Sequence, residues 1–466
     1  MSNDQPPRPS RRGFLKAGGA AVAAGASLGA GLTAPQAAQA AFAKTAGHSA
    51  DPQMAVEPFY GLHQGGIVTP QQSHTYVAAL DLTTEKREDV IALLRAWTDA
   101  AARMTQGNTA APLPAGGTAQ SAQPADNLTN GNADSQAKNQ ADSQSYSQAA
   151  KAAPDSGDVL GLGPCGLTIT FGFGPGLFTK DGKDRYGLAA RRPAALVDLP
   201  RFNGDQLIAQ KTGGDLYIQA CANDQQVAFH AIRQLSRLAS GTAVMRWGQA
   251  GFVSGPRGQT PRNLMGFKDG TNNPSTAKPQ LMNEFVWAGH TDDAPWMEGG
   301  TYTVFRRIRI TLEHWDNTEV GFQEQVFGRH KYSGAPIGKK NEFDPVDLKE
   351  EDKDGNPVIP ENSHVRLSNQ ASNNGAQILR RSYSYNDSTD FYIERWPPWR
   401  QETEYDAGLV FVAHQSDPRK GFIPINEKLA KFDMMNQFTT HVGSAIFAVP
   451  PGAKEGSYIG AELFEA

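Results

Sequence analysis

Three residues in two short stretches have side chains suited to redox or acid–base chemistry. His364 opens the stretch Ser363–Tyr385, in a short alternating run, and Arg380 lies near its end. Asp269 lies between two glycines in the stretch Gly266–Pro274 (GFKDGTNNP). An imidazole, a carboxylate and a guanidinium that come together in a fold can form a metal or cofactor site.

Each of these residues also has a purely structural interpretation. Flanking glycines allow the backbone at Asp269 to approach a ligand closely, and its carboxylate can then act as a general acid–base. The same pattern is typical of a simple turn. A lone histidine in a strand, as expected for His364, is more often structural than a ligand. Alternation turns either Arg380 or Arg381 toward the interior, where a guanidinium needs an anionic partner; the alternative is a surface ion pair for both.

The composition narrows the classes of function. The 466 residues are 39% apolar and 20% charged, with a net charge of −4. These values are ordinary for a soluble protein of one large or two medium domains, and they give no charge excess for nucleic acid. The two cysteines, Cys165 and Cys221, lie in no CxxC or CxxCH motif, which argues against a thiolate cluster and against covalently attached haem. A disulfide between them stays open.

Residues 1–40 have the pattern of a twin-arginine export signal. The motif SRRGFLK at residues 10–16 precedes a weakly apolar, Ala/Gly-rich run and a small-residue site, AQA, at residues 38–40. The run is too weakly hydrophobic for a membrane span, so we predict export to a periplasmic or extracellular location without stable membrane insertion. The alternative is a chance arginine pair in a disordered tail. Because this pathway carries folded proteins, the signal favours a cofactor enzyme.

Residues 105–158 differ in composition from the rest of the chain. They consist mainly of Ala, Ser, Gln, Asn, Gly and Pro. Few apolar side chains are present to offset the entropy of ordering, so we predict a disordered insertion.

The rest of the chain alternates strand-like and helix-like runs in two halves, 55–255 and 256–466. The expected strands are Thr75–Leu82, Leu167–Phe173, Asp215–Ala220, Val304–Leu312, Ser382–Tyr385 and Ala407–His414. The expected helices are Glu85–Ala100, Gln225–Leu235, Glu319–Phe327 and Phe422–Phe432, with Asp224 and Asp417 as N-caps. This pattern favours an α+β fold with antiparallel sheets and peripheral helices, and a duplicated ferredoxin-like fold fits it.

Several longer stretches, taken in order, match one known family. They are PFYGLHQGGIVTPQQ (58–72), DLYIQACAND (215–224), NLMGFKDGTNNP (263–274), FGRHKYSGAPIG (327–338), SHVRLSN (363–369), ILRRSYSY (378–385) and GSAIFAVPPG (443–452). With the export signal, this order resembles the dye-decolourising peroxidase family. The closest likeness is to its twin-arginine-exported subgroup, which includes the haem deferrochelatases.

The resemblance implies a duplicated ferredoxin-like fold that holds one non-covalent haem b per chain between sheet and helices. It implies that His364 is the proximal iron ligand, that Asp269 is the distal acid–base and that Arg380 is the distal, haem-facing arginine. Asp269 would move a proton between the two peroxide oxygens while Arg380 stabilises the developing charge. The further haem contacts that it implies are Gly270, Thr271 and Asn272, and on the proximal side Asn369, Gln370 and Ala371.

Some positions depend on weaker likeness. A carboxylate on the second nitrogen of the proximal histidine makes that histidine a stronger donor, and Asp433 is the candidate. The subgroup commonly has an Asn-Pro-Arg run after the proximal motif, where this chain has Asn369-Gln370-Ala371. The arginine that pairs with a haem propionate is therefore missing there, and Arg366 or Arg329 is expected to replace it.

The segment 386–406 is longer than the resemblance leads us to expect, and it contains Tyr392, Trp396, Trp399 and Tyr405. One interpretation is a surface site that relays electrons from bulky substrates, and the other is aromatic packing of a loop onto the surface.

Three functions remain open. The first is a haem peroxidase that oxidises phenolic or dye-like donors with hydrogen peroxide in one-electron steps. The second is a deferrochelatase that releases iron from haem, with iron-uptake proteins as partners, and the third is a non-enzymatic haem carrier. The sequence favours the first, because a carrier needs neither Asp269 nor Arg380. A homodimer stays open.

Overall fold

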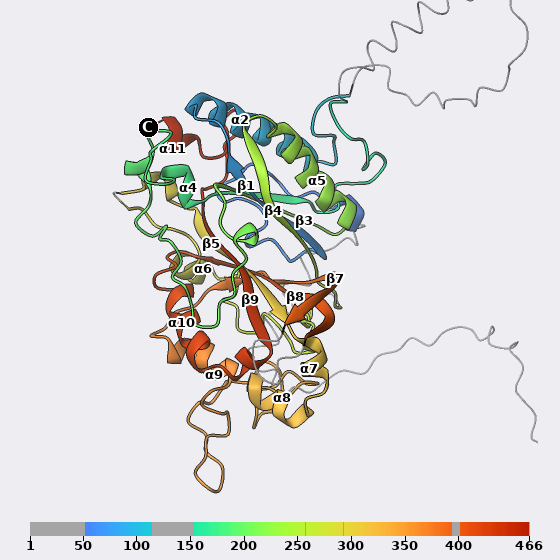
Figure 1. Ribbon diagram of the computed structural model, residues 1–466, viewed down its shortest axis with the longest axis vertical. Coiled ribbons are helices and arrows are strands. Elements are labelled where there is room, and N and C mark those ends of the chain that lie inside the picture. Colours follow the sequence, from blue (N-terminus) through green and yellow to red (C-terminus); the bar gives the residue numbers. More distant parts are fainter. Residues whose placement is uncertain (1–51, 114–152, 257, 292, 394–400, 466) are drawn as a thin grey trace, which may run out of the picture. The chain divides into compact units, whose positions relative to one another are not determined.

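The computed structural model describes residues 52–113, 153–256, 258–291, 293–393 and 401–465 (Figure 1). The predicted export signal lies outside these ranges, as do most of the predicted insertion and Trp396 and Trp399. The ends of the insertion are described, and here the prediction of disorder is wrong: Thr105, Ala110 and Asp155 are all buried.

The strands of the described chain make up one sheet. They are β1 (His74–Leu82), β2 (Thr168–Phe173), β3 (Leu216–Ala222), β4 (Ala243–Phe252), β5 (Thr301–Ile310), β6 (Leu379–Arg380), β7 (Tyr383–Ile393), β8 (Gln401–Gln415) and β9 (Thr439–Val449). Their order is β5-β9-β2-β3-β1-β4-β7-β8-β6, and an additional pairing of β5 with β8 closes the sheet into a barrel. The α+β class is confirmed, but the strands form one closed antiparallel sheet rather than separate sheets.

Helices lie around this sheet. They are α2 (Arg87–Met104), α4 (Pro175–Phe178), α5 (Gln225–Leu238), α6 (Pro279–Phe285), α7 (Leu312–Asp316), α8 (Val320–Phe327), α9 (His364–Ser368), α10 (Phe422–Phe432) and α11 (Ala461–Glu465). Helices α2 and α5 pack side by side, with α5 against β1 and β3, while α10 packs on α9 (Figure 1).

Alternation along β1 explains how one strand serves two cores. Val77 and Ala79 belong to an apolar cluster that also contains Trp247 and Phe305, and Ala78 and Leu80 belong to the large cluster that includes α2 and α5. Successive side chains of a strand point to opposite faces, so both faces of β1 are buried.

Of the two aspartates expected to cap helices, one does so and the other does not. Asp224 caps α5 as expected, since its Oδ1 accepts hydrogen bonds from the backbone N–H groups of Gln226 and Val227. The prediction for Asp417 is wrong: α10 begins after Gly421, and Asp417 instead pairs with Arg419 in the preceding turn.

The segment 386–406 is mostly strand rather than loop. Strands β7 and β8 pair through it, from Asn386 opposite Ala407 to Ile393 opposite Gln401. Tyr405 is 51% exposed on β8. The described part of this segment therefore belongs to paired strands and not to a loop packed on the surface.

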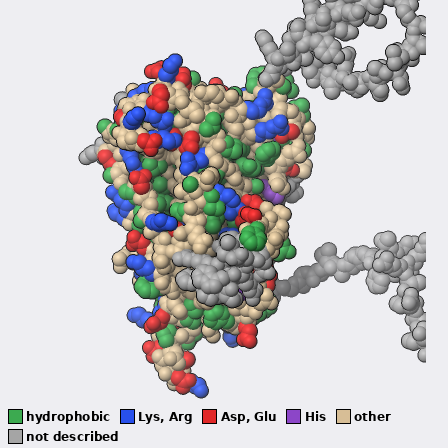
Figure 2. All heavy atoms as spheres, in the orientation of Figure 1, with side chains coloured by type: hydrophobic (Ala, Val, Ile, Leu, Met, Phe, Trp, Pro, Cys, Tyr) green, Lys and Arg blue, Asp and Glu red, His purple; other side chains and the backbone are tan. Residues whose placement is uncertain are grey.

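Cys165 and Cys221 are both buried and form no disulfide. Within the described ranges, no helix is both long and apolar enough to cross a bilayer. On the face drawn in Figure 2, Lys and Arg side chains are interspersed with Asp and Glu.

Candidate active site

The candidate site is a cavity of about 510 Å³ between β5, β8, α9, α10 and the loop before α6. Asp269, Arg380 and His364 all line it. Its other walls are largely apolar, with Phe327, Ile308, Ile310, Leu409, Phe411, Phe422 and Ile425 among them. This size and lining are typical of a pocket for a large, mostly apolar ligand that a few polar groups orient.

Asp269 and Arg380 form an ion pair that faces the cavity. Arg380 Nη1 donates to Asp269 Oδ1 at 2.8 Å, and both side chains are partly exposed. The turn that carries Asp269 depends on glycine, because Gly266 and Gly270 have φ of +85° and +106°. Arg381, the next residue on the chain, is buried and donates to backbone oxygens at Thr69 and Pro70, so alternation places the two arginines on different faces.

Asn273 holds the Asp269 loop against β6. Its Nδ2 donates to the Arg380 carbonyl oxygen at 2.7 Å, and its Oδ1 accepts from the Arg380 N–H at 3.1 Å. In the sequence, Asn273 is recognisable only as part of a turn. An amide with both donor and acceptor can pair with a strand backbone, but its partner is not visible in local sequence.

His364 is the first residue of α9, so the expectation that it lies in a strand is wrong. The helix is short, and Ser363 Oγ donates to the Pro360 carbonyl oxygen just before it. His364 Nδ1 lies 2.6 Å from Asp433 Oδ2, which confirms Asp433 as the carboxylate on this histidine. Asp433 is itself buried, and its Oδ1 accepts the Met435 N–H.

This pair decides which ring nitrogen of His364 can bind a metal. A buried carboxylate on Nδ1 fixes the tautomer and the ring orientation, so Nε2 is the nitrogen left for ligation. The donor set therefore fits an iron held by one imidazole.

The expected cofactor contacts are only partly brought together. Gly270, Thr271, Asn272 and Asn369 line the cavity. Gln370 and Ala371 are absent from the lining among the described residues, and both are exposed in the 3-10 turn Gln370–Ser372. Asn369 Oδ1 accepts the Ala371 N–H and so fixes this turn outside the cavity.

The structure separates the two arginines that were candidates for pairing with an anionic group of the ligand. Arg366 donates to the carbonyl oxygens of Ile359 and Leu348 and does not line the cavity. Arg329 lines the cavity. Burial lowers the pKa of Arg329, Glu342 partly offsets this, and the charge of Arg380 lowers it further. Two arginines at one cavity wall favour an anionic ligand group there.

Glu342 supports the same wall and was not singled out from the sequence. Thr271 Oγ1 donates to Glu342 Oε1 at 3.0 Å, and Lys268 Nζ lies 3.2 Å from Glu342 Oε2. Burial opposes ionisation of Glu342, but hydrogen bonds from Thr260, Thr271 and Lys268 lower its pKa overall.

A histidine held by a carboxylate and an acid–arginine pair share one cavity in an α+β fold. This combination is typical of enzymes that activate a small oxygen compound at a bound metal cofactor. The family models agree: one described as "Dyp-type peroxidase, N-terminal" matches residues 64–133 and 130–253, and one described as "Dyp-type peroxidase, C-terminal" matches residues 260–454. The chain belongs to the Dyp-type peroxidase family.

Similar proteins of the family include two curated relatives. A dye-decolorizing peroxidase of Thermobifida fusca is 36% identical, and a deferrochelatase of Escherichia coli is 32% identical. Each match covers 98% of this chain and 97% of the relative. The solved ferric DtpA of Streptomyces lividans is 35% identical, with a TM-score of 0.73 over 90% of this chain and 100% of that one.

Proposed function

We propose that this chain is a haem b peroxidase that reduces hydrogen peroxide and oxidises dye-like or phenolic donors one electron at a time. The observation that carries the proposal is the shared cavity, which is lined by both the His364–Asp433 pair and the Asp269–Arg380 pair. Membership of the Dyp-type peroxidase family supports it, as does the similar dye-decolorizing peroxidase of Thermobifida fusca.

The residues present fit haem. His364 Nε2 would ligate the iron, Arg329 would pair with an anionic edge of the macrocycle, and apolar walls such as Phe411 and Ile425 would contact its faces. When bound, haem supplies the iron that accepts oxygen from peroxide and the electrons that its reduction requires. Asp433 would make the His364 imidazole a stronger electron donor and keep its ring in one orientation.

On the peroxide, Asp269 and Arg380 would have separate tasks. The Asp269 carboxylate would take the proton from one peroxide oxygen and return it to the leaving oxygen. Arg380 would stabilise the negative charge that develops on that leaving oxygen, and its contact with Asp269 would keep both groups in place.

Absorption spectroscopy tests this function directly. Full-length protein reconstituted with haem should show a Soret band, which should change on addition of peroxide and return when a phenolic donor is added. A His364→Ala variant should lose the ligation signature of the wild type. If wild-type protein binds no haem, the proposed function is wrong.

The deferrochelatase of Escherichia coli favours a second function, release of iron from haem. Anaerobic incubation of the haem-loaded protein distinguishes the two: recovery of iron-free protoporphyrin supports iron release, with proteins of iron uptake as partners. Peroxide-dependent dye oxidation without such recovery supports the peroxidase. A non-enzymatic carrier would bind haem and do neither.

The order of elements supports the finer fold assignment. The first half contains β1, α2, β2, β3, α5 and β4 in that order, with the short α4 between β2 and β3, and its strand order is β2-β3-β1-β4. The second half contains β5, β7, β8 and β9, with the two-residue β6 before β7, and its strand order is β7-β8-β5-β9. We infer that 55–255 and 256–466 are two ferredoxin-like units, which is the arrangement that such repeats of β-α-β-β-α-β produce.

We also propose export by the twin-arginine pathway, with residues 1–40 as the signal and a periplasmic or extracellular destination. The SRRGFLK motif supports this. Replacing Arg11 and Arg12 with lysines should leave the precursor in the cytoplasm, whereas retained export would contradict the assignment.

A further inference from the structure

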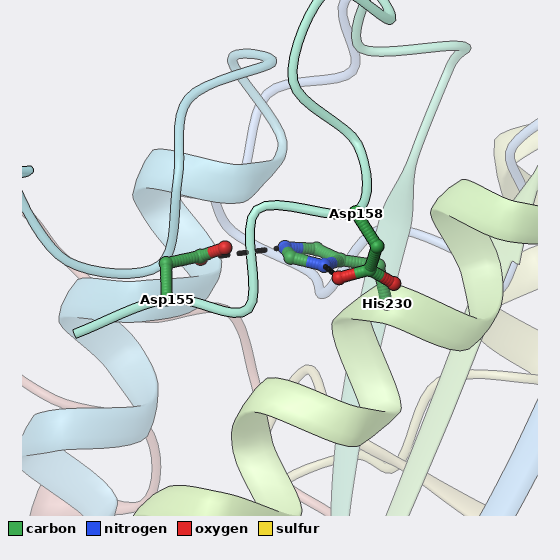
Figure 3. A group of neighbouring side chains, drawn as sticks. All are labelled: Asp155, Asp158 and His230. Atoms are coloured by element: carbon green, nitrogen blue, oxygen red, sulfur yellow. Dashed lines mark hydrogen bonds and ion pairs between the residues drawn. The ribbon is translucent and has the colours of Figure 1, made fainter. Parts of the chain in front are cut away.

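A second group of chemically suited side chains lies away from the cavity. His230 projects from α5 between Asp155 and Asp158, which belong to the segment where the described chain resumes at residue 153 (Figure 3). One ligand-type atom from each residue can be chosen so that all three lie within 4.8 Å of one another. His230 and Asp155 are 1% and 3% exposed, so this group is largely shielded from solvent.

The Nδ1 side of His230 is fully occupied. His230 Nδ1 lies 2.8 Å from Asp158 Oδ1, and Ser156 Oγ also donates to that oxygen. A carboxylate oxygen accepts hydrogen bonds, so Nδ1 carries the proton that it shares with Asp158.

The Nε2 side of the same ring is not satisfied. Nε2 is buried without a hydrogen-bond partner, although Asp155 Oδ2 lies only 3.4 Å away. Asp155 is fixed in this position, because its two oxygens accept the backbone N–H groups of Gly157 and Ala110 at 2.8 Å each.

Neither protonation state of His230 gives Nε2 a hydrogen bond. In the neutral ring, the Nε2 lone pair faces a carboxylate oxygen, so two acceptors meet in a buried site. In the charged ring, Nε2 would be ion-paired with Asp155 at 3.4 Å, but its proton would still lack an aligned acceptor. A cation between Nε2 and Asp155 would satisfy both groups at once.

We propose that His230 Nε2 and Asp155 Oδ2 ligate a divalent cation of the zinc class, with Asp158 as the positioning residue on Nδ1. Two ligands of a tetrahedral zinc, each about 2.0–2.2 Å from the metal, are separated by about 3.4 Å. A carboxylate on the other imidazole nitrogen is the usual support of a metal-binding histidine. Water would fill the remaining coordination positions at the Nε2 edge of the ring, opposite Asp158 (Figure 3).

The site would be structural, because it would fasten the segment 153–158 to the middle of α5. Ala110, which follows α2, is joined to the same carboxylate. The cation would thus connect both described ends of the 105–158 region to one helix, independently of the proposed haem chemistry.

Zinc binding to the full-length chain tests the proposal. Protein stripped with a chelator and then exposed to Zn²⁺ should retain one more equivalent per chain than His230→Gln does, measured by elemental analysis after gel filtration. His290→Gln is the matched control, since His290 also lies beside a carboxylate, Glu298, but on the surface. Zinc at any other histidine is common to both variants and cancels.

The positioning role has its own readout. Asp158→Asn should weaken Zn²⁺ affinity by about 10- to 100-fold in a calorimetric titration while leaving the stoichiometry at one. Zinc X-ray absorption of the wild type should show one imidazole among oxygen ligands, which guards against a variant that simply misfolds. The proposal is overturned if the wild type retains no zinc, or if His230→Gln and His290→Gln retain equal amounts.

Discussion

Asp269 and Arg380 touch at 2.8 Å, yet each supplies something that the other cannot. Asp269→Asn keeps the shape and a partner for Arg380 but removes the group that accepts a proton. We expect kcat for peroxide-dependent dye oxidation to fall by about 10²- to 10⁴-fold, as is usual for loss of a general acid–base. Steady-state assays check this, with Asp354→Asn, an exposed acid outside the cavity, as the control.

Haem loading is the companion measurement for that variant. The Soret band per chain should match the wild type, because the proposed iron ligand is His364. If Asp269→Asn oxidises dye within a few-fold of the wild type, another group moves the proton.

We expect substitutions of Arg329 and Arg366 to have different effects on haem affinity. Arg329 lines the cavity, so Arg329→Met should weaken haem binding by about 10- to 100-fold, the usual effect of a lost charge-assisted hydrogen bond. Arg329→Lys should retain part of the affinity because it keeps the charge. Transfer of haem to a competing apoprotein measures the difference.

Arg366→Met is the control for that series. Its guanidinium is occupied by backbone carbonyls, so its loss should lower the melting temperature with little effect on haem affinity. Equal haem affinity in Arg329→Met and the wild type would show that Arg329 does not pair with the anionic group of the haem.

At the scale of elements, the Asn273 amide joins the Asp269 loop to β6. Asn273→Ala removes both hydrogen bonds to the Arg380 backbone and should let the arginine move relative to the acid. We expect kcat to fall by about tenfold or more, since small misplacement of a catalytic group is costly, with little change in KM for the dye. Asn273→Asp, which keeps the acceptor only, should be intermediate. An unchanged kcat in Asn273→Ala would show that β6 needs no such support.

Elements set by local sequence could be predicted, and those set by distant contacts could not. The cap at Asp224 and the alternation of β1 act within a few residues, so their signals are in the sequence. The five-residue helix at His364 depends on Pro360 and on Asp433, which is far along the chain. Closure of the sheet through β5 and β8 likewise has no local signal.

The candidate site shows the same division. Composition and spacing singled out His364, Asp269 and the two arginines but left each with a structural alternative. Their roles are implied by resemblance to a family. The same resemblance implies cofactor contacts for Gln370 and Ala371, which are exposed and do not line the cavity. Contacts such as Asn273 with Arg380, more than a hundred residues apart, exist only in the folded chain.

At the scale of the whole molecule, the first half contributes one wall to a cavity built mainly by the second. Within the described chain, the cavity lining consists of residues 202–205 from the first half and of residues from position 263 onward. Asp205 pairs with buried Arg306 on β5, and Arg306 Nε donates to His441 Nδ1 at 2.9 Å. Burial, and then the charge of Arg306, hold the pKa of His441 well below its usual value. Because Nδ1 accepts from Arg306, this contact needs a neutral His441.

His414 on β8 is a second buried histidine with a lowered pKa, and it makes the stability of the fold depend on pH. Burial, and then the charge of Arg381, lower its pKa to about 3. In the unfolded chain a histidine titrates near 6.5, so below that pH the unfolded state binds more protons and the folded state loses stability until the folded pKa is reached. At pH 4.5 this one group costs about 2–3 kcal/mol. His414→Gln, whose amide can still bond Thr303, should therefore lose less melting temperature than the wild type between pH 7 and pH 4.5 in calorimetry. Carboxylates titrate alike in both proteins and cancel, so identical losses would mean that His414 is not held neutral by the fold.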